Sequence, residues 1–273
     1  MTVTIIFATA LVLYVGASGM LAASFAGGRV MAPRSGAALI AAAVLLHGVG
    51  LVAFTANHAE LPLVGLAPSL CTLAFLIALF LFATTIANES KPVALVLVPL
   101  IALLLAIALV LGIAPSGQPL AFRGVWFSLH VLLAFIGYAG LAIAFGAGVL
   151  YLLQFRELKG KRLGRVFRFF PPLPVLDTLG RRGIIIGFAA LTLALVLGWA
   201  WTVRFQRSLA TENPQVIWGI ITWLTFVALL YMRLSRRAGS ERRAAFANVI
   251  GFIVVVACYV MLRVFMTGEQ VFL

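Results

Sequence analysis

The chain has 273 residues, of which 64% are hydrophobic and 10% are charged. Soluble domains contain roughly 45–50% apolar and about 25% charged residues, whereas the mean hydropathy here is +1.16. This composition excludes a soluble globular protein, because so much apolar surface requires lipid as its solvent. The formal net charge of +13 is therefore interpreted as a record of membrane topology, and we expect no nucleic-acid partner.

Eight segments are long and apolar enough for a transmembrane helix, which needs about 20 residues. In chain order they are residues 2–25, 36–56, 65–87, 92–114, 124–155, 183–203, 215–232 and 244–266. No Lys or Arg precedes the first segment, while Arg29 and Arg34 follow it, so we predict a retained helix instead of a signal peptide. The sequence predicts an all-α polytopic bundle with eight spans, forming one integral membrane domain over residues 1–273.

The basic residues are distributed unequally between alternate loops. The loops after the first, third, fifth and seventh spans hold 16 of them, whereas the other loops hold Arg123, Arg204 and Arg207. Lys and Arg collect in cytoplasmic loops. We therefore predict that both termini lie on the outer side of the membrane.

The one long connection, residues 156–182, carries eight of the basic residues and a run of phenylalanines at Phe167, Phe169 and Phe170. This pattern is typical of a segment that lies on the anionic inner leaflet. A solvated cytoplasmic loop with an incidental aromatic run remains an equal alternative.

The chain has three histidines, and none of its Asp or Glu residues lies deep in a predicted span. His47 lies about 16 Å into the second span and His130 about 9 Å from the outer end of the fifth. His58 follows the second span. This pattern disfavours a carboxylate proton relay or a transporter, but it suits haem, whose iron accepts a neutral imidazole. By depth, His130 pairs better with His58 than with His47 as a metal ligand, and a packing role is an equal alternative for His130. His47 is either a further haem contact or a packing residue that hydrogen-bonds across helices.

Tryptophans and cysteines add less specific signals. Trp126, Trp199 and Trp201 lie near predicted outer span ends, where they form either an interfacial aromatic belt or a shelf for a flat cofactor. Trp218 and Trp223 are likewise haem-stacking or packing candidates. The two cysteines lie in apolar runs without a CxxC or CxxCH motif, so zinc binding and covalent haem attachment to this chain are disfavoured.

The second half of the chain contains four ordered segments with the pattern of a known family. The matching residues are Trp126, His130, Val131, Tyr138 and Ala139; Leu176, Asp177, Leu179, Arg182, Gly187, Phe188, Leu191, Thr192, Gly198 and Trp201; Pro214, Trp218, Ile221, Thr222, Trp223 and Leu224; and Gly251, Phe252, Ile253, Val254, Val255, Cys258 and Tyr259. In these segments the chain resembles the cytochrome c assembly family, which includes CcsA, CcmC, CcmF, HemX and YpjD. The resemblance implies a CcsA-like core over about residues 60–266.

The chain also departs from the CcsA pattern. Members of the CcsA type carry a tryptophan-rich outer loop, but the corresponding residues 204–213 contain no tryptophan. The second outer histidine of the family falls near Gln270, and the late seventh-span histidine falls at Tyr231. The chain therefore most resembles the short HemX and YpjD branch.

The resemblance implies a protein of the bacterial inner membrane that binds or passes haem at its outer, periplasmic face, or assists a haem-handling complex. Enzymatic activity is not expected. His130 is then the main haem contact, with His58, His47 and the five tryptophans as secondary candidates. The alternative is a cofactor-free accessory or regulatory protein that binds another membrane protein, such as a transporter. Besides the lipid bilayer, other inner-membrane proteins are the expected partners.

Overall fold

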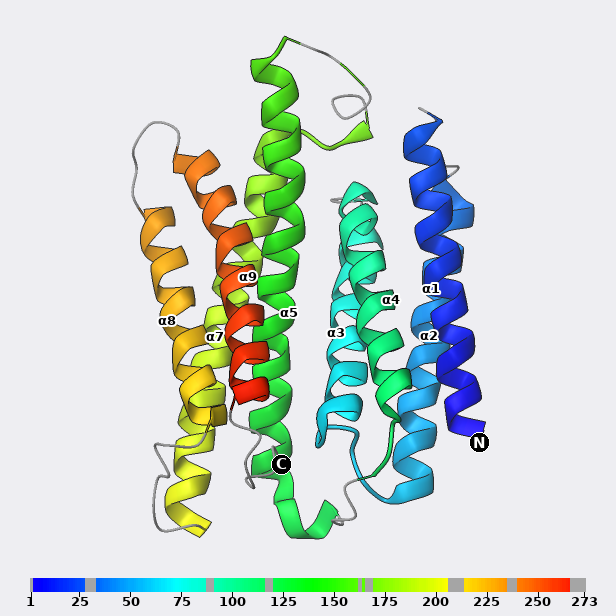
Figure 1. Cartoon of the computed structure of the whole chain (residues 1–273), viewed down its shortest axis with the longest axis vertical. Coiled ribbons are helices and arrows are strands. Elements are labelled where there is room, and N and C mark those ends of the chain that lie inside the picture. The colour runs from blue at the N-terminus through cyan, green and yellow to red at the C-terminus, as the bar shows by residue number, and fades with distance from the viewer. Residues whose placement is uncertain are drawn as a thin grey trace. The chain divides into compact units, whose positions relative to one another are not determined.

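The computed structural model describes residues 2–27, 33–86, 91–115, 120–161, 164, 169–205, 214–234 and 240–265. This part of the chain forms helices α1 (Thr2–Ala26), α2 (Pro33–His58), α3 (Leu66–Ile86), the 3-10 turn η1 (Lys91–Val93), α4 (Ala94–Leu111), α5 (Leu120–Lys159), α7 (Leu173–Phe205), α8 (Pro214–Leu234) and α9 (Ser240–Phe265) (Figure 1). Eight of these helices are long and apolar enough to cross a membrane. The predicted all-α fold with eight candidate membrane spans is thus confirmed for the described residues, while the side on which the termini lie stays a prediction.

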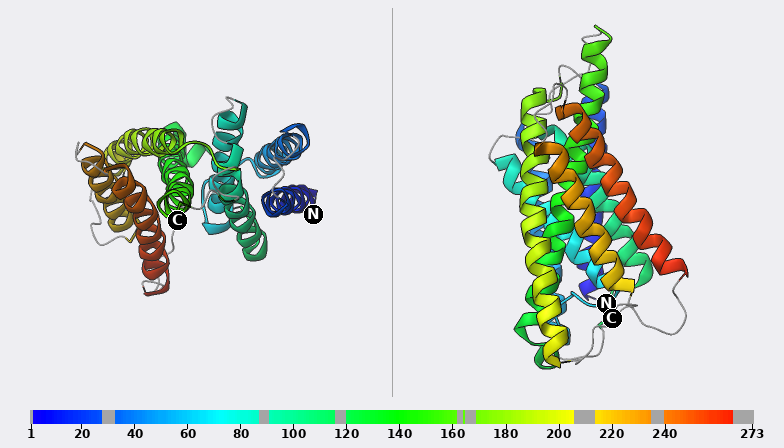
Figure 2. Two further views of the ribbon diagram at one scale, coloured as in Figure 1. Left: turned by 90° about the horizontal axis from the view of Figure 1, so that it is seen from above. Right: turned by 90° about the vertical axis from the view of Figure 1, so that its left-hand side faces the viewer.

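The helices form two compact units, one comprising Met1–Phe122 and Leu150–Leu176 and the other Arg123–Val149 and Asp177–Leu273. In the first unit, α1 and α3 each pack against both α2 and α4, so the four helices close a ring (Figure 2). Its core contains large, fully buried side chains from all four helices, including Phe7, Phe54, Ile77 and Leu97.

The second unit consists of most of α5 and α7 together with α8 and α9. The backbones of α5 and α7 approach closely at Gly140 and Gly183, where a Cβ on either glycine would lie 2.5–2.6 Å from the carbonyl oxygen of the other. Small residues permit this kind of close helix contact in a membrane. The core of the unit comprises Leu141, Ala144, Ile184, Leu191, Phe226, Leu229 and Val255.

The connection after α5 is shorter than the sequence predicts. Helix α5 continues to Lys159, and α7 begins at Leu173 instead of residue 183. Proline is favourable in the first turn of a helix because the amide hydrogens there have no intrahelical acceptor, which suits Pro174. Residues 173–182 of the predicted basic loop are therefore helical.

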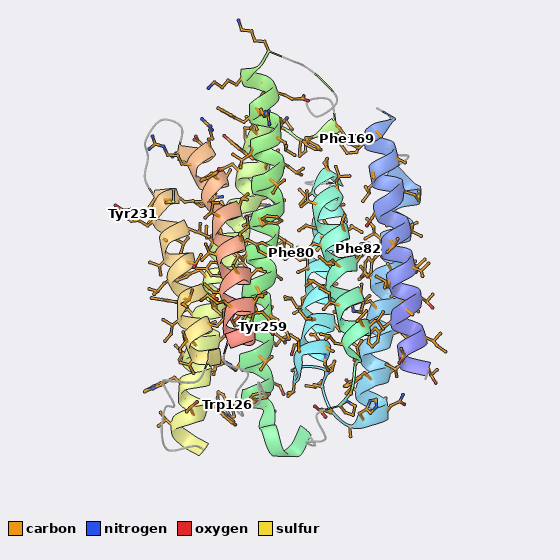
Figure 3. The ribbon with its side chains drawn as sticks, viewed as in Figure 1. Phe80, Phe82, Trp126, Phe169, Tyr231 and Tyr259 are labelled. Carbon is orange, nitrogen blue, oxygen red and sulfur yellow. The ribbon has the colours of Figure 1, made fainter. Side chains whose placement is uncertain are left out.

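Two phenylalanines of this connection pack within the first unit. The ring of Phe170 is stacked on that of Phe25 at the end of α1, with ring centroids 5.7 Å apart, and Phe169 makes an edge contact with Phe25 at 5.5 Å (Figure 3). Phe170 is buried. This packing accounts for both residues without insertion into the inner leaflet, while Phe167 lies outside the described residues.

Candidate functional site

His130 on α5 makes a short polar contact with α7 inside the second unit. Its Nδ1 lies 2.6 Å from the carbonyl oxygen of Ala194. Because a carbonyl oxygen can only accept a hydrogen bond, Nδ1 carries the proton and Nε2 keeps its lone pair. This is the arrangement that typically orients a histidine for metal ligation.

Gly198 on α7 makes room for the His130 ring. A Cβ added at Gly198 would lie 2.6 Å from Cε1 and 2.8 Å from Nδ1 of His130. One turn of α7 thus positions His130 in two ways. The backbone carbonyl of residue 194 accepts its hydrogen bond, and the glycine at residue 198 leaves space for its ring. Gly198 matches the family pattern, but this role could not be predicted from the sequence, because the contact joins residues far apart in the chain.

Tryptophans lie at the same end of the second unit. The side chains of Trp126 and Trp199 are 62% and 58% exposed, and Trp126 lies near the beginning of α5 (Figure 3). Trp201 instead packs against Phe127, with ring centroids 5.7 Å apart. The exposed rings suit both interpretations, an aromatic belt or a surface for a flat cofactor.

Trp218 and Trp223 of α8 are held by protein contacts. The Trp218 indole donates to the carbonyl oxygen of Val255 at 3.1 Å, and the Trp223 indole donates to Oγ1 of Thr192 at 3.0 Å. Rings of Tyr138 and Tyr259 lie 4.5 and 5.0 Å from that of Trp218. These contacts favour the packing interpretation, since they use the polar atom of each indole.

His47 is fully buried in the first unit. Its Nδ1 lies 3.4 Å from the hydroxyl oxygen of Tyr14, and its Nε2 lies 3.3 Å from Sγ of Cys71. The rings of Phe7 and Phe75 contact it edge to face at 5.7 and 5.4 Å. Both nitrogens face polar groups, so iron ligation would require the loss of one of these contacts. The geometry favours the packing alternative.

His58 is the last residue of α2 and is exposed. Its Nδ1 donates to the carbonyl oxygen of Phe54 at 2.9 Å, which leaves its Nε2, like that of His130, with a lone pair. His58 belongs to the first unit and His130 to the second, so their pairing as axial ligands stays a prediction.

The structure describes only some of the residues at which the sequence departs from the CcsA pattern. Tyr231 is 75% exposed and projects away from α8 (Figure 3). Gln270 and residues 206–213 of the tryptophan-free loop lie outside the described residues.

Most of this chain is similar to known proteins. Residues 63–268 match the family described as cytochrome C assembly protein. A cytochrome c biogenesis protein CcsA of Prochlorococcus marinus (strain MIT 9515) is 33% identical over 191 residues, which cover 60% of this chain and 61% of the relative. CcsA proteins of Guillardia theta and Chlamydomonas reinhardtii are 30% and 33% identical over 154 and 149 residues.

These alignments cover 51% and 55% of this chain and 51% and 40% of the two algal proteins. The chain thus matches about half of the length of its curated relatives. The family match spans both units and includes His130, Gly198 and the tryptophans of α8. The chain belongs to the cytochrome c assembly protein family.

Proposed function

We propose that the chain handles haem during cytochrome c assembly, with Nε2 of His130 as an axial contact at the outer face of a bacterial inner membrane. Membership of the family and the similarity to CcsA cytochrome c biogenesis proteins support the haem-handling role. The missing tryptophans in residues 204–213 support a place in the short HemX and YpjD branch.

One observation carries this proposal: the hydrogen bond from Nδ1 of His130 to the Ala194 carbonyl. It fits haem, because iron accepts the neutral nitrogen that such a bond leaves available. Bound haem would supply the metal and a large apolar ring. The chain itself orients the imidazole through Ala194 and makes space for it at Gly198, and the exposed faces of Trp126 and Trp199 could contact an apolar ring.

Haemin titration of the purified full chain in detergent tests the proposal. We expect a Soret band to develop, and we expect His130→Ala to weaken haemin binding by tenfold or more, on the order of 1.4 kcal/mol. Added imidazole should restore part of the band in this variant, because it replaces the missing ligand. Tyr231→Phe, a change at an exposed ring, is the matched control. A wild-type chain that takes up no haemin, or an unchanged His130→Ala spectrum, would contradict the proposal.

His58→Ala tests the second ligand separately. If His58 pairs with His130, the Soret maximum should shift while haemin remains bound. An unshifted band would show that His58 is not a ligand, without affecting the assignment of His130.

The packing of Trp218 and Trp223 favours a second candidate, a cofactor-free accessory protein. The Trp218 ring already packs against Tyr138 and Tyr259, and the Trp223 ring packs against Phe188, which leaves fewer aromatic faces for a haem platform. In this case a photocrosslinker at Lys161, after α5, should capture one defined inner-membrane protein, and the purified chain should stay colourless with haemin.

A further inference from the structure

A cluster of arginines gathers at one end of the second unit. Arg233 lies in the last turn of α8, and the neighbouring α9 begins with further arginines. Nη1 of Arg233 donates to Oδ1 of Asp177 at 2.9 Å, which brings the beginning of α7 to the same level. The arginine cluster comprises Arg181, Arg182, Arg233, Arg242 and Arg243.

Arg233 is fixed at the centre of this cluster. Its side chain is 8% exposed. When the amide of Asn248 on α9 is oriented with Oδ1 toward the guanidinium, Nη2 donates to it at 3.0 Å. A Cβ at Gly180 would lie 3.0 Å from Nη2, so glycine leaves the space that the guanidinium occupies. The side chain therefore ties α7, α8 and α9 together.

The cluster carries more positive charge than its own carboxylates neutralise. Among the described residues at this end, five arginines face two carboxylates, Asp177 and Glu241. Asp177 is already paired with Arg233, and Arg181 lies close enough to Arg233 to repel it. The Nε of Arg233 is buried and has no hydrogen-bond acceptor among the described residues. The excess positive charge indicates an anionic partner, whereas the Nε of Arg233 is too buried to meet one at the surface.

The position of the arginine cluster at the helix ends indicates which kind of anion it binds. Arg233 lies in the last turn of the candidate span Val216–Leu234, and Arg242 and Arg243 lie in the first turn of the candidate span Ser240–Met261, so the cluster lies at the ends of these apolar helices. Guanidinium groups bind phosphate through parallel hydrogen bonds. Basic sites between transmembrane helices bind the headgroups of anionic lipids. We propose that the α7–α8–α9 end of the second unit binds the phosphate of an anionic phospholipid.

Native mass spectrometry of the full chain tests this proposal, using phosphatidylglycerol and, as the uncharged comparison, phosphatidylcholine. We expect the chain to retain phosphatidylglycerol in preference to phosphatidylcholine. The double variant Arg181→Gln/Arg243→Gln removes two exposed charges and leaves the Asp177–Arg233 pair intact. It should weaken phosphatidylglycerol binding roughly 25-fold, from about fivefold for each arginine near the membrane surface.

Arg123→Gln/Arg204→Gln is the matched control. It removes the same amount of charge at the beginning of α5 and the end of α7, which is the end of the second unit opposite the arginine cluster. It should leave retention of phosphatidylglycerol within twofold of the wild-type value. Equal retention of the two lipids, or equal effects of the two double variants, would overturn the proposal. A third measurement uses inorganic phosphate. If the chain binds phosphate without a preference for the lipid, the site binds a soluble anion, and the phospholipid proposal is rejected.

Discussion

Nε2 of His47 and Sγ of Cys71 lie 3.3 Å apart in the core of the first unit, where both side chains are fully buried. With Tyr14 on its other nitrogen, this imidazole is held by helices α1 and α3 at once. Among the described residues, His130 has a polar contact to a backbone carbonyl at Nδ1. The two histidines of the apolar spans thus have different environments, one suited to packing and the other to ligation.

Loss of a polar partner of His47 should destabilise the first unit. Tyr14→Phe keeps the ring but removes the hydroxyl group that faces Nδ1, and interhelical hydrogen bonds in membranes contribute about 0.5–1.5 kcal/mol. We expect a lower melting temperature in a thiol-independent thermal unfolding assay in detergent. His58→Ala, at an exposed histidine of the same unit, should leave the melting temperature almost unchanged. Equal melting temperatures for Tyr14→Phe and the wild type would show that the contact does not stabilise the protein.

Gly198→Ala should displace the His130 ring. The added methyl group would lie 2.6 Å from Cε1, and such overpacking typically costs about 1–3 kcal/mol. We expect a lower melting temperature together with weaker haemin binding. Gly19→Ala is the control, because its Cβ meets nothing within 4 Å and alanine is the better helix former by about 1 kcal/mol. A Gly198→Ala variant as stable as Gly19→Ala would contradict the described contact.

Asp177→Asn should strongly destabilise the second unit. It leaves the buried Arg233 guanidinium without its counter-charge, and breaking one side of a buried ion pair costs about 3–5 kcal/mol. Thermal unfolding and the yield of folded protein measure the effect. Glu241→Gln, an exposed carboxylate at the same end, should change the free energy of unfolding by less than about 0.5 kcal/mol. If the two substitutions had similar effects, the Asp177–Arg233 pair would not contribute to stability.

The predicted topology is tested by fusions in a bacterium. Because 16 basic residues lie in one set of predicted loops, several of them in the helix ends beside these loops, the C-terminus should face the periplasm. Alkaline phosphatase fused there should be active, and a green fluorescent protein in the same place should be dark. The reverse pattern at the C-terminus would place the basic loops outside and reject the predicted orientation.

Sequence analysis predicted the helices better than it predicted their contacts. All eight predicted spans correspond to helices, because a run of apolar residues long enough to cross a bilayer is a local property of the chain. The predicted beginning of α7 was wrong. Asp177, Arg181 and Arg182 are charged, and charged residues are typical of a loop outside the membrane. Their helical state becomes understandable only with the pairing of Asp177 and Arg233.

At the candidate site, too, the residues could be predicted from the sequence but their contacts could not. The rarity of histidine in apolar segments singled out His47 and His130, because a polar group in lipid requires a partner. Which partner each one has could not be predicted: Ala194, Tyr14 and Cys71 come from other helices, and spacing along the chain carries no record of such contacts.

The sequence alone determined that this chain crosses a membrane with eight helices and resembles the cytochrome c assembly family, since apolar length and ordered motifs can be observed residue by residue. Only the tertiary structure decided that His47 packs among Tyr14 and Cys71, that Gly198 makes room for His130, and that Trp218 and Trp223 hydrogen-bond within the bundle. The physical reason is that helix faces meet through side-chain shape and polar pairing between distant segments, and these are properties of the packed bundle.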